Sequence, residues 1–113
     1  MTPDERQFLM TAAWMFMRHG QRLRALAVCE ALMEEDARDG VVAVALSGLL
    51  LDEGEAARAL ELLRAAEVPS SLAHAAAVLE TRALRTLGRD AEATDRWNRY
   101  VEARKGVARK WTA

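Results

Sequence analysis

A short stretch near the middle of the chain reads LDEGEAARA over residues 51–59. The same spacing of glycine and alanine occurs 34 residues earlier in MRHGQRLRA (17–25) and 34 residues later in RTLGRDAEA (85–93). In every copy an alanine follows the glycine by five residues, and the pairs are Gly20 with Ala25, Gly54 with Ala59, and Gly88 with Ala93. Glycine at the end of one helix and a small residue early in the next are typical of a tight helical hairpin. The sequence therefore predicts three hairpins of equal length.

Other positions recur in register with these glycines. Seven residues before each glycine is a small residue, and five before it is a residue that we place at the contact between helices; the two sets are Ala13, Ser47, Thr81 and Met15, Leu49, Ala83. Glu80 is the poorest fit, since its equivalents are Leu46 and Ala12. A period of about 34 residues is that of the tetratricopeptide repeat, and the alternative is an ordinary helical bundle with a coincidental period. We expect an all-α fold of three tetratricopeptide-like helix–turn–helix repeats, six helices in all, stacked as a short right-handed superhelix.

The 113 residues suit a single domain, with repeats at about 6–38, 40–70 and 71–105 and a basic tail at 105–113. Thr2 is the expected N-cap of a first helix that begins with Pro3. Asp39 is the expected cap of a third helix, and a serine of Ser70-Ser71 that of a fifth. The expected helices span residues 3–18, 22–35, 40–52, 56–66, 71–87 and 91–104.

The composition limits the class of protein. Hydrophobic residues make up 51% of the chain, and the net charge is −1, so no broad electrostatic attraction to nucleic acid or to an anionic membrane is expected. No apolar run approaches the roughly 20 residues that span a bilayer. The start of the chain is acidic where a signal peptide is basic, and one cysteine cannot form an internal disulfide. We expect a cytoplasmic protein.

No group of residues predicts catalysis. His19 falls in a turn and His74 early in a helix, and neither has metal-ligand partners at a suitable spacing. Cys29 occupies a core position, where a small buried hydrophobe is the simplest interpretation. Asp36 and Asp39 lack further oxygen ligands at loop spacing. We therefore expect a protein that is not an enzyme and that uses no cofactor and no metal.

The first helix of every repeat is expected to line a concave groove. The lining positions lie thirteen, ten, six and three residues before each turn glycine, and they are Gln7, Met10, Trp14, Met17, Val41, Val44, Gly48, Leu51, Ala75, Val78, Arg82 and Arg85. Most of these residues are apolar, and an exposed apolar groove of this size favours an occupant. A distinct partner helix, the N-terminal residues of the chain itself or a second copy could fill it. Trp14 is the expected anchor, and Arg82 and Arg85 are expected to fix the orientation of the partner.

Several motifs resemble a family of bacterial type III secretion chaperones, the YscY type. The start, Arg6-Gln7-Phe8-Leu9 followed by Ala13-Trp14-Met15 and Gly20, is similar to the opening of that family. The stretch Glu30-Ala31-Leu32 is similar to its Asp-Ala-Leu, and the series Ala93, Trp97, Tyr100, Val101, Glu102 is similar to its aromatic-rich close. The chain departs from the family at Ala13, which replaces a glycine, and in the connector 38–40, which lacks a proline.

The resemblance implies a small virulence-associated chaperone of protein transport. Such a chaperone would bind a small secreted protein of the YscX type as a heterodimer and present it to the export-gate protein. It would be located in the bacterial cytoplasm, at the inner membrane when it engages the secretion apparatus. The YscG type, which sequesters the needle subunit, is the nearest alternative.

Two other classes of binding protein stay open. A self-associating scaffold would form a homodimer through its groove in the absence of a partner. A generic adaptor would capture a C-terminal carboxylate, but that use requires a groove rich in Lys, Arg and Asn. The predicted lining offers Arg82 and Arg85 alone among these residue types.

Overall fold

The computed structural model describes residues 1–112 and is all-helical over this range. Three hairpins follow one another along the chain, and a short 3-10 turn, η1 (Ser70–Leu72), precedes the third. The helices are α1 (Pro3–Arg18), α2 (Arg22–Glu35), α3 (Gly40–Asp52), α4 (Ala56–Ala65), α5 (Ala73–Thr86) and α6 (Asp90–Thr112). The predicted all-α repeat fold is confirmed.

The three hairpin turns share one backbone geometry. Gly20, Gly54 and Gly88 have φ angles of 72°, 82° and 75°, the left-handed region that glycine enters without steric cost. The residue after each glycine donates its N–H to the carbonyl five residues earlier: Gln21 to Phe16, Glu55 to Leu50 and Arg89 to Leu84, all at 2.8 Å. This bond defines the Schellman ending of a helix. The 34-residue period of the sequence is therefore a period of turn geometry.

Small residues allow the two helices of each hairpin to approach closely. Ala25, Ala59 and Ala93, the alanines of the repeated turn motif, are all fully buried. In the middle hairpin Ser47 is also buried, and its hydroxyl donates to the carbonyl of Ala59 at 3.2 Å. Around them lies a continuous apolar core with Leu32, Leu46, Leu50 and Leu84 among its fully buried side chains.

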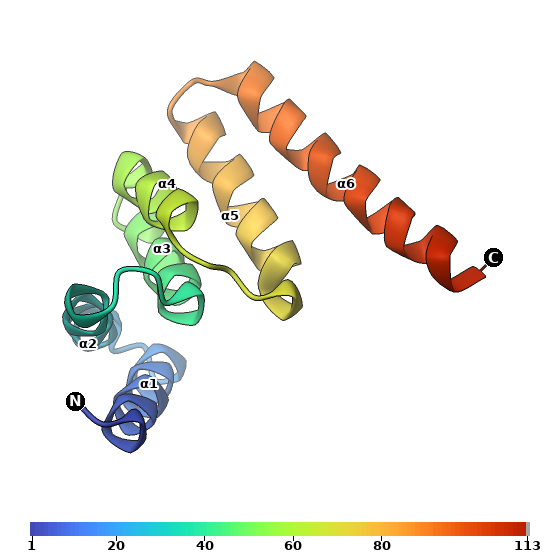
Figure 1. Cartoon of the computed structure of the whole chain (residues 1–113). Coiled ribbons are helices and arrows are strands. Elements are labelled where there is room, and N and C mark those ends of the chain that lie inside the picture. Colours follow the sequence, from blue (N-terminus) through green and yellow to red (C-terminus); the bar gives the residue numbers. More distant parts are fainter. Residues whose placement is uncertain (113) are drawn as a thin grey trace.

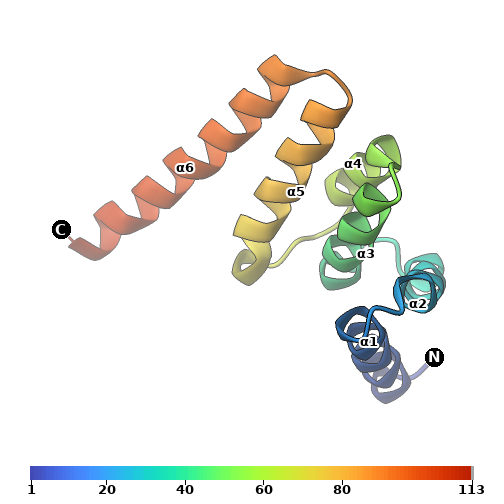
Figure 2. The ribbon, with the colours of Figure 1, turned by 180° about the vertical axis from the view of Figure 1, so that it is seen from behind.

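Successive hairpins lie side by side and form an open, curved stack (Figure 1). Each second helix packs on the first helix of the next hairpin, α2 on α3 and α4 on α5. The radius of gyration is 15.2 Å, above the roughly 13 Å expected of a compact domain of this length. The view from behind places the N-terminus and the C-terminus at opposite ends of the stack (Figure 2). The protein therefore exposes more surface than a spherical domain would.

A backbone contact joins two connectors that are distant in sequence. The N–H of Glu67, after α4, donates to the carbonyl of Arg38, after α2, at 2.9 Å. Gly40 lies beside this bond, and a Cβ atom there would come within 2.2 Å of the Glu67 carbonyl oxygen. The absence of a side chain at Gly40 therefore permits the close approach of the two connectors.

Two helix ends differ from the sequence prediction. The last helix does not stop near residue 104: α6 continues through the expected tail to Thr112, and its final turns extend away from the stack. Lys105 pairs with Glu102 at 3.3 Å, and the remaining tail residues include good helix formers. Neither serine caps α5 with its side chain, because the chain forms η1 there and α5 begins at Ala73. No helix within residues 1–112 has the length and apolarity that crossing a bilayer requires.

Candidate functional site

The predicted lining residues lie on α1, α3 and α5, the first helices of the three hairpins. They border three hollows along these helices rather than one continuous trough. The first hollow, about 430 Å³, lies between α1 and the start of α3. It brings together four predicted residues, Gln7, Met10, Trp14 and Val41. Trp14 is 52% exposed, so its indole can be buried by an incoming side chain.

The second hollow, about 960 Å³, is the largest and lies beside the first hairpin turn. Of the predicted residues it contains Met17, Gly48 and Arg82. Among the described atoms, a Cβ on Gly48 would meet Leu79 at 4.0 Å, so the floor of the hollow at Gly48 is open. Leu23, from α2, also lines this hollow, and the sequence analysis missed it because it assigned the lining to first helices alone.

The third hollow, about 400 Å³, lies between α5 and α6. It contains the predicted residues Val78, Arg82 and Arg85 together with Trp97. Arg82 borders both this hollow and the second one, and it pairs with Asp52 of α3 at 3.3 Å. The cationic end of the groove therefore carries a partly neutralised arginine.

The remaining predicted residues contribute less side-chain surface. Leu51 is buried in the core, so the expectation that it lines the groove is wrong. Its position in the middle hairpin has close neighbours on both sides of the stack, which the count from the turn glycine does not reveal. Val44 and Ala75 are half-buried.

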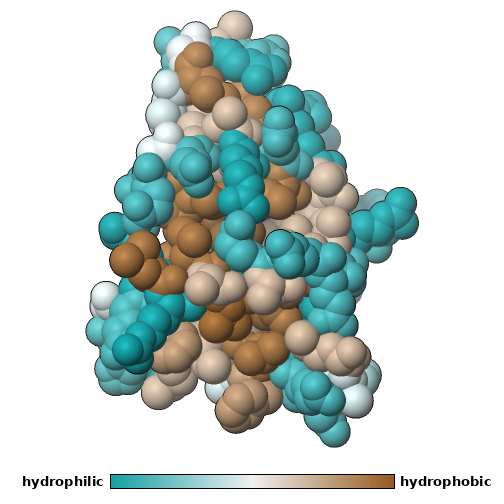
Figure 3. Space-filling model, turned by 90° about the vertical axis from the view of Figure 1, so that its left-hand side faces the viewer, coloured by the Kyte–Doolittle hydropathy of each residue, from teal (hydrophilic) through white to brown (hydrophobic). Residues whose placement is uncertain are grey.

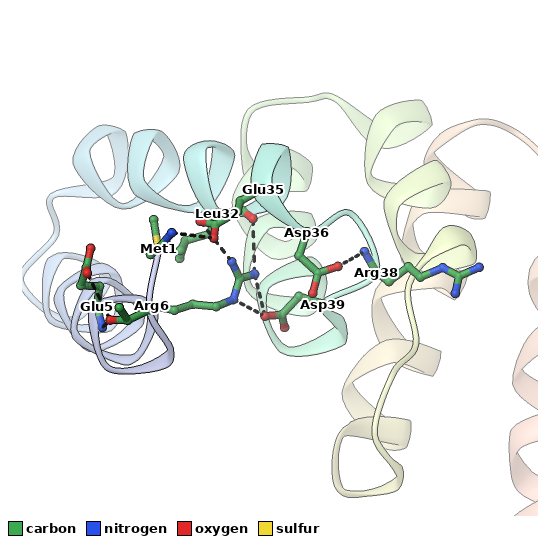
Figure 4. Close-up of polar contacts among 9 residues, drawn as sticks. Met1, Glu5, Arg6, Leu32, Glu35, Asp36, Arg38 and Asp39 are labelled. Carbon is green, nitrogen blue, oxygen red and sulfur yellow. Dashed lines mark hydrogen bonds and ion pairs between the residues drawn. The ribbon is translucent and has the colours of Figure 1, made fainter.

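A polar contact fixes one wall of the first hollow (Figure 4). The guanidinium of Arg6, on α1, donates to Asp39 at 2.7 Å and to the carbonyl of Leu32 at 3.3 Å. The other carboxylate oxygen of Asp39 accepts the N–H groups of Val41 and Val42, each at 3.1 Å, and so caps α3. Burial raises the pKa of Asp39, but the bonds from Arg6 and from the backbone outweigh it and leave the pKa below its ordinary value. An ionised carboxylate thus joins α1 to α3.

Apolar surface gathers on the side of the molecule that faces left in Figure 1. The space-filling view of that side shows broad apolar areas crossed by hydrophilic side chains (Figure 3). Exposed large hydrophobic residues of the first two hairpins are Phe8, Trp14, Met15, Leu23 and Val41. Met15 had been expected at a contact between helices, and its exposure corrects that expectation. Its equivalents Leu49 and Ala83 are buried.

The reactive side chains do not form a catalytic group. Burial and the neighbouring Glu30 raise the pKa of the Cys29 thiol to about 11, which keeps it protonated at neutral pH. His74 packs its ring against Trp97 and Tyr100, with centroids 6.0 and 5.6 Å away, an aromatic cluster that the sequence analysis did not find. Within residues 1–112 no three His, Cys, Asp or Glu side chains lie close enough together to hold a metal ion.

No protein-family model matches the chain, and no curated protein or solved structure matches it significantly. The concave face itself is therefore the basis for a functional proposal.

Proposed function

We propose that the protein is a chaperone that binds an amphipathic helix of a partner protein along the concave face of α1, α3 and α5. The observation that carries the proposal is the first hollow, where Trp14, Met10 and Val41 surround an open apolar space. Methionine beside tryptophan forms an adaptable surface that suits the apolar side of a helix. At about 25 cal/mol per Å² of apolar area, a few such anchors offset the ordering of a short segment.

The polar groups of the groove would set the direction of the bound helix. Arg85 and Arg82 lie at the α5 end, where they can meet acidic residues or the C-terminal end of the partner helix. The apolar hollow at α1 and the cationic hollow at α5 make the groove asymmetric. A helix with an apolar face and an acidic terminus is therefore the chemistry that fits best.

Within this class we propose a type III secretion chaperone of the YscY type, acting on a small secreted protein of the YscX type in the bacterial cytoplasm. The support is the resemblance of the motifs at Arg6–Leu9, Trp14 and Trp97–Glu102 to that family. A co-chaperone of the needle subunit, of the YscG type, would use the same groove. We expect no catalytic activity in either case.

Co-expression with small secretion proteins encoded nearby tests the proposal. The expected result is a one-to-one complex, seen by tag pull-down and light scattering. Complex formation should be lost in Trp14→Ala and Met17→Glu but kept in Val107→Glu, which changes an exposed residue of α6 outside the groove. Binding that survives both groove variants would show that the concave face is not the site.

A fluorescence titration gives a second readout of the same site. In a Trp97→Phe, Trp111→Phe background Trp14 is the remaining tryptophan. Burial of its half-exposed indole by a partner helix should shift its emission to shorter wavelength. An unchanged spectrum in a complex confirmed by light scattering would contradict the assignment of Trp14 as the anchor.

A further inference from the structure

Two exposed apolar residues of α1 occupy positions that are buried in the other hairpins. Phe8 is 72% exposed, whereas Val42 and Ala76, its equivalents 34 and 68 residues later, are 0% and 5% exposed. Met15 is 44% exposed, whereas its equivalents Leu49 and Ala83 are 6% and 0% exposed. The same face of the first helix is therefore covered in hairpins two and three and open in hairpin one.

The stacking explains what covers this face. In the second and third hairpins the preceding second helix packs on the first one, α2 on α3 and α4 on α5. Within the described residues no helix packs on α1 in the corresponding way. Phe8 and Met15 thus form a stacking surface of the kind that a helix covers elsewhere in this fold.

The charges on this face identify a suitable occupant. Asp4, Phe8, Thr11, Met15 and Arg18 follow one another at intervals of four, three, four and three residues, so they form one stripe along α1. The stripe has an acidic residue at its start, a basic residue at its end and the small Thr11 near its middle. If the stripe is reversed, Asp4 meets Arg18 and Phe8 meets Met15. The stripe is therefore complementary to itself in an antiparallel pair.

We propose that two copies of the chain associate through α1, antiparallel, around a two-fold axis next to Thr11. Each Phe8 packs on Met15 of the other copy, and each Asp4 pairs with Arg18 of the other copy, as an isologous interface requires. Gln7, Met10 and Trp14 lie on the neighbouring face of α1, at the first hollow, and stay outside the contact. The inference goes beyond the proposed binding function and does not depend on it.

The other end of the stack does not offer an equivalent surface. Leu60 of α4 is buried, whereas its equivalent in α6 is Thr94, which is polar and exposed. A polar residue there caps the stack, as terminal repeats usually do. Continued head-to-tail stacking would place the apolar stripe of α1 against this polar surface, so the closed antiparallel pair is the better match.

Sedimentation and light scattering over a range of concentrations test the association. We expect a dimer whose dissociation constant rises at least about a hundredfold in Phe8→Glu and in Met15→Glu, since each change acts twice in the pair. Val107→Glu, on exposed surface of α6, is the matched control and should leave the dimer intact. A monomer at every concentration overturns the proposal. A dimer that is lost in Trp14→Ala but kept in Phe8→Glu also overturns it, because that pattern indicates contact through the groove.

Charge reversal separates the pairing from any loss of folding. Asp4→Arg and Arg18→Asp should each weaken the dimer, and the double variant should recover most of the affinity. Both reversals oppose the dipole of α1, so the double variant is the least favourable of the three for the isolated helix. Recovery can therefore come from the contact between copies alone, and a double variant weaker than either single one overturns the pairing.

A disulfide test fixes the register. Residues near the two-fold axis approach their own counterparts, so Thr11→Cys should link two copies on mild oxidation. In Gln7→Cys the two thiols would be about 13 Å apart along the helix axis, at 1.5 Å per residue, and should not link. Cys29 is fully buried and does not compete. Equal linking of the two variants, or linking of Gln7→Cys alone, overturns the antiparallel register.

Discussion

Leu46 in the second hairpin and Glu80 in the third occupy the same repeat position and are stabilised in opposite ways. Leu46 is fully buried in the apolar core. Glu80 is also buried, but its carboxylate accepts hydrogen bonds from Arg96 of α6 and from Arg64 of α4, the latter at 3.4 Å. The poor fit of Glu80 to the repeat pattern thus has an explanation in two arginines from neighbouring helices.

The comparison shows that one backbone position can be filled by a hydrocarbon side chain or by an ionic network. The hydrocarbon gains stability from burial in proportion to its area. The ionic network must first offset the desolvation of its charges, so it adds less net stability but ties three helices, α4, α5 and α6, with directional bonds. The third hairpin should therefore be more sensitive to loss of one partner than to replacement of all of them.

The largest effect is expected in the second hairpin. Leu46→Ala should lower the free energy of unfolding by about 3 kcal/mol, because it removes a fully buried side chain and leaves a cavity. Urea unfolding followed by circular dichroism measures the change. Val107→Ala, on exposed surface, is the control and should change stability by less than about 0.5 kcal/mol. A small effect of Leu46→Ala would show that the core around it collapses readily.

Glu80→Gln should cost somewhat less, about 2 kcal/mol, because it leaves the partly buried guanidinium of Arg96 without a carboxylate. The double variant Glu80→Leu, Arg96→Met turns the network into a hydrocarbon contact like that of Leu46. It should return to within about 1 kcal/mol of the wild-type protein in the same urea experiment. If the double variant were less stable than Glu80→Gln, the two hairpins could not be interchanged in this way.

The ionic contact between the first and second hairpins should depend on pH. The pKa of Asp39 is lowered in the folded protein, so its contribution is present above its unfolded pKa of about 4 and is lost as the pH falls through the folded value. Asp39→Asn should cost about 1 kcal/mol at pH 7 and make stability less dependent on pH below about 4. Urea midpoints at pH 7 and at pH 3 test this. An equal acid dependence in both proteins would exclude Asp39 as the titrating group.

The smallest effect is expected at the surface ion pair of α3 and α5. Arg82 and Asp52 are both about half exposed, so Arg82→Gln should change the free energy of unfolding by less than about 0.5 kcal/mol. The same variant should still weaken partner binding if Arg82 orients the bound helix. Parallel unfolding and pull-down measurements separate the two roles.

Most of the fold could be predicted because its signals are local. The turn glycines, the cap residues Thr2 and Asp39, and the alanines at the close helix contacts are each recognisable from the residue type and its spacing. The length of α6 was missed since an exposed helical extension carries no periodic apolar pattern. The start of α5 was missed because Ser70 and Ser71 form a 3-10 turn in place of a cap.

The site could be predicted only in part, because repeat register does not report exposure. Counting from the turn glycine identified the face that contains Trp14, Met10 and Val41. The same count could not distinguish Leu51, which is buried, from its exposed counterparts. It also could not show that Met15 is open to solvent, because exposure depends on which helices pack nearby and not on the residue itself.

The bond between the connectors at Arg38 and Glu67 has a mechanical consequence. It fastens the end of the first hairpin to the link between the second and third, at the place where Gly40 leaves room for nothing larger than hydrogen. Bending of the stack at this edge would break the bond or press the two connectors together, so the stack is stiff there. A methyl group added by Gly40→Ala would act as a wedge and splay the hairpins. The curvature of the whole molecule thus depends on a residue that has no side chain.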